Sequence, residues 1–132
     1  NGQLHTIDVN AELAQIQRTY FDRSDYGTQI IQHVGNALDI IPKLDITFDL
    51  IFIDAEKKQY DNFLEAVLPK TKSGSVILSD NVLWSGKVVE PLDPKDVTTK
   101  VLLDYNKKLS EHPLLETVLL PIRDGLTLSR VK

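Results

Sequence analysis

The chain has 132 residues, of which 42% are hydrophobic and 26% charged, a composition typical of one globular domain. Its net charge of −4 gives no general positive field for nucleic acid, so a small molecule is the default partner. The absence of cysteine excludes disulfides and thiolate metal sites, and no apolar run approaches the roughly 20 residues that cross a membrane, so we predict a cytoplasmic protein without a membrane partner.

The first residues predict that the chain is part of a longer protein. The sequence opens with Asn1-Gly2, without an initiator Met, and a strand pattern follows at once from Gln3 to Val9. We therefore expect residues 1–132 to be the C-terminal part of a single domain.

Strand-like and helix-like stretches then alternate, which predicts an α/β fold with a parallel sheet flanked by helices. Residues 3–9 are the first predicted strand, and residues 11–21 are a predicted amphipathic helix lying on the sheet. The apolar stripe of this helix is Leu13, Ile16, Tyr20 and Phe21. Residues 28–34 form the second predicted strand, and a short helical turn ends near Pro42.

The middle of the chain repeats this alternation. Residues 48–53 are almost free of polar side chains, which predicts a central strand covered on both faces. A helix over residues 60–68 follows, with Phe63, Leu64, Val67 and Leu68 on its buried face. Ser73-Gly74 is then a predicted turn into a strand at residues 75–79.

The last third predicts a helix and a hairpin. Asp93 is the predicted N-cap of a helix that runs to about His112. Its buried stripe is Val97, Val101, Tyr105 and Leu109. Residues 115–121 and 126–131 flank Arg123-Asp124-Gly125, a hairpin signal that closes the sheet with an antiparallel pair.

Polar side chains directly follow three of the predicted strands. In open α/β sheets the ligand lies beyond the carboxyl ends of the strands, so these are the positions where chemistry is expected. Asp54, Asp80 and Asn81 would bring two carboxylates and an amide oxygen to neighbouring strand ends, a set that suits Mg²⁺. The alternative is that they cap helices and form turns.

Two further features have both a binding and a local interpretation. Asp8 could accept hydrogen bonds from ribose hydroxyls, or it could be the N-cap of the following helix. Gly35-Asn36-Ala37 could border an adenine ring, or it could be a plain tight turn.

Lys57 follows Asp54 by three residues and would start beside the metal. A neighbouring dication favours the neutral amine, which suits a general base. Lys58 is interpreted as a solvated surface charge, although the motif alone does not separate it from Lys57. Other chemistry is not indicated: the three histidines are dispersed and are treated as structural, and Ser79 has no evident histidine partner.

Two segments resemble the cation-dependent class I O-methyltransferases, the caffeoyl-CoA and catechol O-methyltransferase group. They are Phe52-Ile-Asp-Ala-Glu-Lys-Lys-Gln-Tyr60 and Ser79-Asp-Asn-Val-Leu-Trp-Ser-Gly-Lys-Val88. Further matches at residues 5–8, 35–38 and 120–126 extend the resemblance over nearly the whole chain, in the family's order. It implies a Rossmann-like methyltransferase sheet, mostly parallel, with a C-terminal antiparallel hairpin.

The resemblance also implies the cofactors and the role of each residue. The family uses S-adenosylmethionine and a divalent cation, usually Mg²⁺, to methylate one hydroxyl of a catechol-like small molecule. The implied cofactor-binding residues are Asp8, Asn36, Ala37 and Asp54. The implied metal ligands are Asp54, Asp80 and Asn81. The implied catalytic residues are Lys57, as the base, and Asp54. Lys57 and Trp84 are the implied substrate-contacting residues, and Trp84 with the loop at residues 82–91 would help to enclose the substrate. The alternative for Trp84 is a core residue.

The sequence departs from the family at several places. Asn36 stands where many relatives have Asp, and Ser73 replaces the first of a frequent Gly pair. The family's first strand, its Gly-rich loop and its N-terminal helices would precede Gly2. We therefore expect either an unfilled slot or changed strand pairing between residues 3–9 and 48–53, and poor cofactor binding by this chain alone. A homodimer is expected for the full-length protein.

Three alternative functions follow from the same residues. Some bacterial relatives methylate a hydroxylated tRNA base, although the acidic balance here disfavours nucleic acid. A catalytically silent nucleotide-binding or interaction module is the second. A dinucleotide-dependent dehydrogenase is the third, and it is disfavoured because no hydride-transfer partner is visible.

Overall fold

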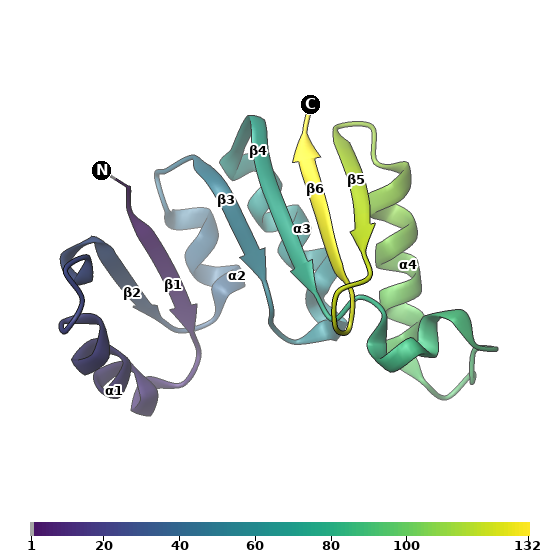
Figure 1. Cartoon of the computed structure of the whole chain (residues 1–132), viewed down its shortest axis with the longest axis horizontal. Coiled ribbons are helices and arrows are strands. Elements are labelled where there is room, and N and C mark those ends of the chain that lie inside the picture. Colours follow the sequence, from purple (N-terminus) through teal and green to yellow (C-terminus); the bar gives the residue numbers. More distant parts are fainter. Residues whose placement is uncertain (1) are drawn as a thin grey trace. The chain divides into compact units, whose positions relative to one another are not determined.

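The computed structural model describes residues 2–132, which form two compact units that meet between Asp45 and Ile46 in the sequence. The elements of unit one are β1 (Leu4–Asp8), α1 (Ala11–Phe21), β2 (Ile30–Val34) and α2 (Ala37–Ile40). Those of unit two are β3 (Phe48–Ile53), α3 (Tyr60–Val67), β4 (Thr71–Asp80), α4 (Val97–Glu111), β5 (Leu115–Leu120) and β6 (Leu126–Val131) (Figure 1). Within residues 2–132, no helix has the length and apolar character to cross a membrane.

Unit one is a parallel pair of strands with a helix beside it. β1 and β2 pair along their full length, from Leu4 opposite Ile30 to Asp8 opposite Val34. Asn10 caps α1 by accepting a hydrogen bond from the Glu12 amide, so the predicted helix has the bounds that its pattern indicated. The second strand starts two residues later than predicted because residues 27–29 form a 3-10 turn.

The apolar stripe of α1 is not buried, contrary to the prediction. Leu13, Ile16 and Tyr20 are 41%, 57% and 63% exposed. The helix contacts β2 through polar groups instead: Arg18 donates to the carbonyl of Ile30, and Gln32 donates to that of Ala14. Two short strands and the four-residue helix α2 also offer too little area to cover a stripe of large side chains on α1.

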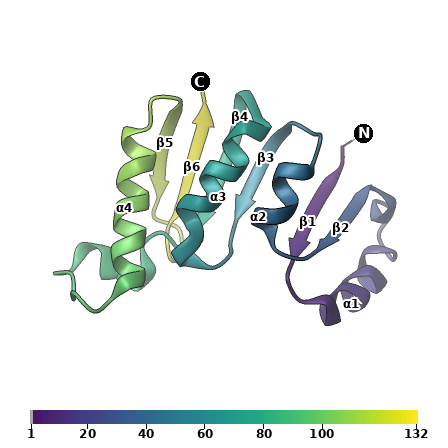
Figure 2. The same ribbon diagram turned by 180° about the vertical axis from the view of Figure 1, so that it is seen from behind.

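Unit two is a four-stranded sheet in the order β3-β4-β6-β5. β3 and β4 are parallel, whereas β6 is antiparallel to both of its neighbours. Three strands of this sheet therefore share one direction and only β6 opposes them, which confirms the predicted mostly parallel sheet with a C-terminal hairpin. Both α3 and α4 cover the same face of the sheet, behind it in Figure 1 and in front of it in Figure 2.

The core of unit two lies between this face and the two helices. Fully buried aromatic and aliphatic side chains fill it, and Tyr60 of α3 meets Tyr105 of α4 edge to face, with ring centroids 5.3 Å apart. The buried helix positions are Tyr60, Phe63, Leu64, Val67, Thr99, Leu102, Tyr105 and Leu109. On α3 the predicted face is confirmed except for Leu68, which lies beyond the helix; on α4, Tyr105 and Leu109 are buried but Val97 is 56% exposed.

The prediction that the strand at residues 48–53 is central and covered on both faces is wrong for this structure. β3 is an edge strand of the four-stranded sheet, and its Leu50 and Phe52 are 59% and 58% exposed on the face opposite the helices. No strand among residues 2–132 pairs with the second edge of β1 or of β3. Of the two expected outcomes, the changed pairing of β1 with β3 does not occur among these residues.

Two predicted boundaries moved for local reasons. Asp96, not Asp93, is the N-cap of α4, because its carboxylate accepts a hydrogen bond from the Thr99 amide. The Asp93 carboxylate instead accepts the Lys95 amide in a separate turn before the helix. Residues 73–74 are not a turn: β4 runs through them, and the positive φ of Gly74 lies where the pairing with β3 changes register.

Candidate active site

The carboxyl ends of β3 and β4 lie side by side at the lower edge of unit two in Figure 1. Ile53 is paired with Ser79 in the parallel ladder, so Asp54 and Asp80 are the next residues on neighbouring strands. The hydroxyl of Tyr60 lies 3.3 Å from the carbonyl oxygen of Ile53 and 2.9 Å from that of Asp80. The structure thus brings the two predicted carboxylate residues to one edge of the sheet.

Lys57 is held at this edge by two hydrogen bonds. Its Nζ donates to Asp54 Oδ1 at 2.8 Å and to Tyr60 Oη at 2.7 Å, and it lies 4.9 Å from the centroid of the Tyr60 ring. The Lys57 side chain is only 12% exposed, whereas that of Asp54 is 49% exposed. The neighbouring Lys58 is exposed. The amine of Lys57 is therefore oriented within the site.

Tyr60 is a residue of this site that sequence reasoning missed. Burial raises the pKa of its hydroxyl, and the carboxylates of Asp54 and Asp80 raise it further, so the group stays protonated at neutral pH. Tyr60 is the last residue of the motif at residues 52–60, but no role was predicted for it. The available signal was its place three residues after Lys57 at the start of a helix, where side chains at that spacing meet.

Asp80 and Asn81 turn the chain away from the sheet. Asp80 Oδ1 accepts the amide of Asn81 at 2.7 Å, and Asn81 has a φ of 57°, the left-handed region that Asn tolerates better than most residues. Within residues 2–132, no three His, Cys, Asp or Glu side chains are arranged to hold a metal ion. A cation at this edge would depend on two carboxylates, the Asn81 amide oxygen and outside oxygens, a hard all-oxygen set that fits Mg²⁺.

The loop after β4 rests on the turn between β5 and β6. The amides of Val82 and Leu83 donate to the carbonyl oxygens of Gly125 and Asp124, at 3.1 and 2.9 Å, and the Asp124 carboxylate accepts the Ser85 amide. Trp84 on this loop is half-buried, so part of it is open to solvent and it is not a fully enclosed core residue.

Three of the four residues predicted to bind the cofactor, Asp8, Asn36 and Ala37, lie at the carboxyl ends of β1 and β2, whereas the fourth, Asp54, follows β3. The Asp8 carboxylate accepts the amide of Asn10, and its carbonyl accepts that of Gly35, both at 2.9 Å. Asn10, not Asp8, caps α1, so the capping interpretation of Asp8 is wrong. Asn36 does cap α2, through its bond from the Leu38 amide, and Ala37 is the first residue of that helix.

His5 and His33 are paired, although their positions in the sequence are dispersed. Neighbouring strands bring His5 Nδ1 within 3.0 Å of His33 Nε2, with the rings stacked 5.2 Å apart. Burial lowers the pKa of His5, and so does the nearby His33. His5 and His33 are 28 positions apart in the sequence, so a comparison with local metal-ligand spacings does not reveal that they are paired.

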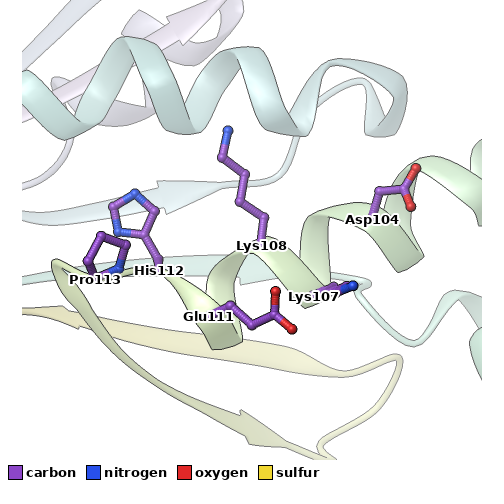
Figure 3. A pocket seen from close by; sticks show the side chains of 6 residues that line it. All are labelled: Asp104, Lys107, Lys108, Glu111, His112 and Pro113. Carbon is purple, nitrogen blue, oxygen red and sulfur yellow. The ribbon is translucent and has the colours of Figure 1, made fainter.

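A surface hollow of about 370 Å³ lies along the C-terminal half of α4 (Figure 3). Its lining residues are Asp104, Lys107, Lys108, Glu111, His112 and Pro113. Lys108 is already engaged by Asp61 and Glu65 of α3, whose hydrogen bonds raise the pKa of its ammonium group. No predicted site residue lines this hollow, so it is separate from the chemistry described above.

Comparison with known proteins gives a consistent result along the whole chain. A family model described as O-methyltransferase matches residues 1–132. Caffeoyl-CoA O-methyltransferase of Petroselinum crispum is 32% identical over 141 residues, which cover 98% of this chain and 58% of that protein. Caffeoyl-CoA O-methyltransferase 2 of Eucalyptus globulus is 33% identical, with 98% and 57% covered. The chain thus spans less than two thirds of these relatives' length.

Solved structures agree with this similarity. The O-methyltransferase TomG from Streptomyces achromogenes, in complex with S-adenosylmethionine, superposes with a TM-score of 0.89 at 27% identity, over 99% of this chain and 62% of that one. Cofactor-bound Rv0187 from MTB also gives 0.89 at 27% identity, over 98% and 62%.

Proposed function

The chain belongs to the O-methyltransferase family, and on that basis we propose that the whole protein methylates a hydroxyl of a catechol-like small molecule, using S-adenosylmethionine and a divalent cation. The relatives support the reaction class, since they include caffeoyl-CoA O-methyltransferases and a structure with S-adenosylmethionine. The observation that carries the proposal is the contact of Lys57 with both Asp54 and Tyr60 beside the carboxyl end of β4.

The residues of unit two would handle the acceptor. Asp54, Asp80 and Asn81 would hold the cation, which when bound makes an acceptor hydroxyl more acidic. Lys57 takes the proton from that hydroxyl, and the resulting oxygen anion forms a bond to the donor methyl carbon as the carbon–sulfur bond breaks. Trp84 would wall the acceptor from the neighbouring loop. Holding the oxygen and the methyl in line supplies much of the rate gain.

The residues of unit one would handle the methyl donor. The Asp8 carboxylate at the end of β1 can accept the two ribose hydroxyls, as acidic residues at strand ends do in nucleotide-binding sheets. Asn36 and Ala37 open α2 beside it and would border the adenine. The Asn36 side chain is already used as a helix cap, which favours backbone contacts at this position.

Methylation of a hydroxylated tRNA base is the second candidate, and the net charge of −4 disfavours it. Incubating the full-length protein with S-adenosylmethionine labelled in its methyl group, Mg²⁺ and one acceptor at a time would decide. We expect label in catechol and not in resorcinol, whose hydroxyls are too far apart to share one cation. Label in unmethylated tRNA alone would favour the second candidate, and no transfer to either diol would contradict the proposal.

A further inference from the structure

We infer that Tyr60 is a positioning residue for Lys57: its hydroxyl fixes the amine relative to the end of β4, an inference that rests on the proposed function. Nothing in the reaction requires Tyr60 to touch the acceptor or the methyl donor. Its role would be to fix the distance between the proton acceptor and the strand that carries Asp80.

The Tyr60 hydroxyl accepts a hydrogen bond from Lys57 and donates one to the backbone of β4. A phenolic oxygen can accept and has one proton to donate. It accepts from Lys57 Nζ at 2.7 Å, and it donates to the carbonyl of Asp80 at 2.9 Å, the shorter of its two contacts with backbone carbonyl oxygens. One hydroxyl thus connects the amine to the backbone of the neighbouring strand.

Tyr60 is better placed to hold the amine than Asp54 is. Tyr60 is 0% exposed at the start of α3, and its ring packs edge to face on Tyr105. The Asp54 side chain is 49% exposed. A buried ring with two side-chain torsions has little freedom, whereas an exposed carboxylate can rotate and would also be shared with a cation.

The chain contains a matched control for this role. Tyr105 is 1% exposed, and its hydroxyl bonds to Ser79 Oγ at 2.7 Å. It lies in the same aromatic pair as Tyr60 but has no hydrogen bond to Lys57. Removing either hydroxyl deletes one buried polar group of the same kind, and only one of the two contacts the amine.

The test compares Tyr60→Phe with Tyr105→Phe in the full-length protein, assayed with S-adenosylmethionine, Mg²⁺ and catechol. We expect both variants to lower the melting temperature by similar amounts. Only Tyr60→Phe should lower kcat, by about 10- to 100-fold, because a small misplacement of a reacting group has a cost of that size. The KM values for S-adenosylmethionine and for catechol should be nearly unchanged. In a Lys57→Ala background, Tyr60→Phe should cause no further loss.

Equal kcat losses in the two tyrosine variants would overturn the inference, and so would a full additional loss on top of Lys57→Ala. If the wild-type protein methylates no diol, the proposed function fails by itself. A crystal structure of Tyr60→Phe then decides the inference: a displaced or disordered Lys57 amine supports it, and an unmoved amine contradicts it.

Discussion

His5 and His33 form a pair in which two positively charged rings would repel each other. Their nitrogens are 3.0 Å apart across β1 and β2. Two imidazolium ions at that distance would repel, and each would have lost a hydrogen-bond acceptor. The pair is therefore stable when at least one ring is neutral.

This arrangement predicts how stability depends on pH. Burial and His33 hold the pKa of His5 below its usual 6.5, so the folded state binds a proton less readily than the unfolded state does. The stabilisation is complete above pH 6.5 and is lost as the pH falls. Melting temperatures between pH 8 and 5 should drop less for His5→Gln than for wild type. An unchanged profile for His5→Gln would contradict the expectation.

At the scale of residues, the sequence predicted those site positions that directly follow an apolar strand. Asp8, Asp54 and Asp80 lie at the expected strand ends because the end of a strand is a local property of the chain. The contact of Tyr60 with Asp80 and the pairing of His5 with His33 were not predicted, because each depends on strands that are distant in the sequence.

At the scale of elements, the turn between β5 and β6 supports the loop that follows Asn81. Gly125 has a φ of 81°, and a Cβ there would lie 2.4 Å from Leu83 Cγ. Gly74 also has a positive φ, 90°, but a Cβ there would meet nothing within 4 Å. A side chain at Gly74 would therefore cause backbone strain alone, whereas one at Gly125 would also cause steric overlap with Leu83.

Alanine at these glycines should destabilise the protein unequally. Gly74→Ala should cost about 1 kcal/mol of unfolding free energy, the strain of a positive φ. Gly125→Ala adds overlap with Leu83 and should cost about 2 to 4 kcal/mol. Urea unfolding of both variants measures the difference; equal losses would mean that the loop moves away from the turn at no cost.

The bounds of the helices were predicted better than the burial of the side chains. The bounds of α1 follow from local capping and spacing and were predicted in full, whereas α4 begins at Val97 because Asp93 forms a separate turn. The pattern of β3 predicted coverage on both faces, but burial depends on which elements lie against a strand, and the strand's own sequence does not contain that information.

At the scale of the molecule, one face of the unit-two sheet is open and apolar. Phe52, Leu78, Leu128 and Val118 form one row across its four strands, on the face opposite α3 and α4. Phe52 and Val118 are 58% and 50% exposed. A row of this kind is usual where a sheet is covered by a further layer. The predicted homodimer and the cytoplasmic location stay predictions.

The central claim is that the oxygen-bearing residues at the ends of β3 and β4 serve a cation-assisted methyl transfer. Methyl transfer to catechol by the full-length protein, measured in EDTA and after Mg²⁺ is restored, tests it most directly. We predict loss of activity in EDTA, recovery with Mg²⁺, and a fall of about 100-fold or more in Asp80→Asn, which keeps the side-chain shape but loses the charge. Full activity in EDTA would contradict the claim.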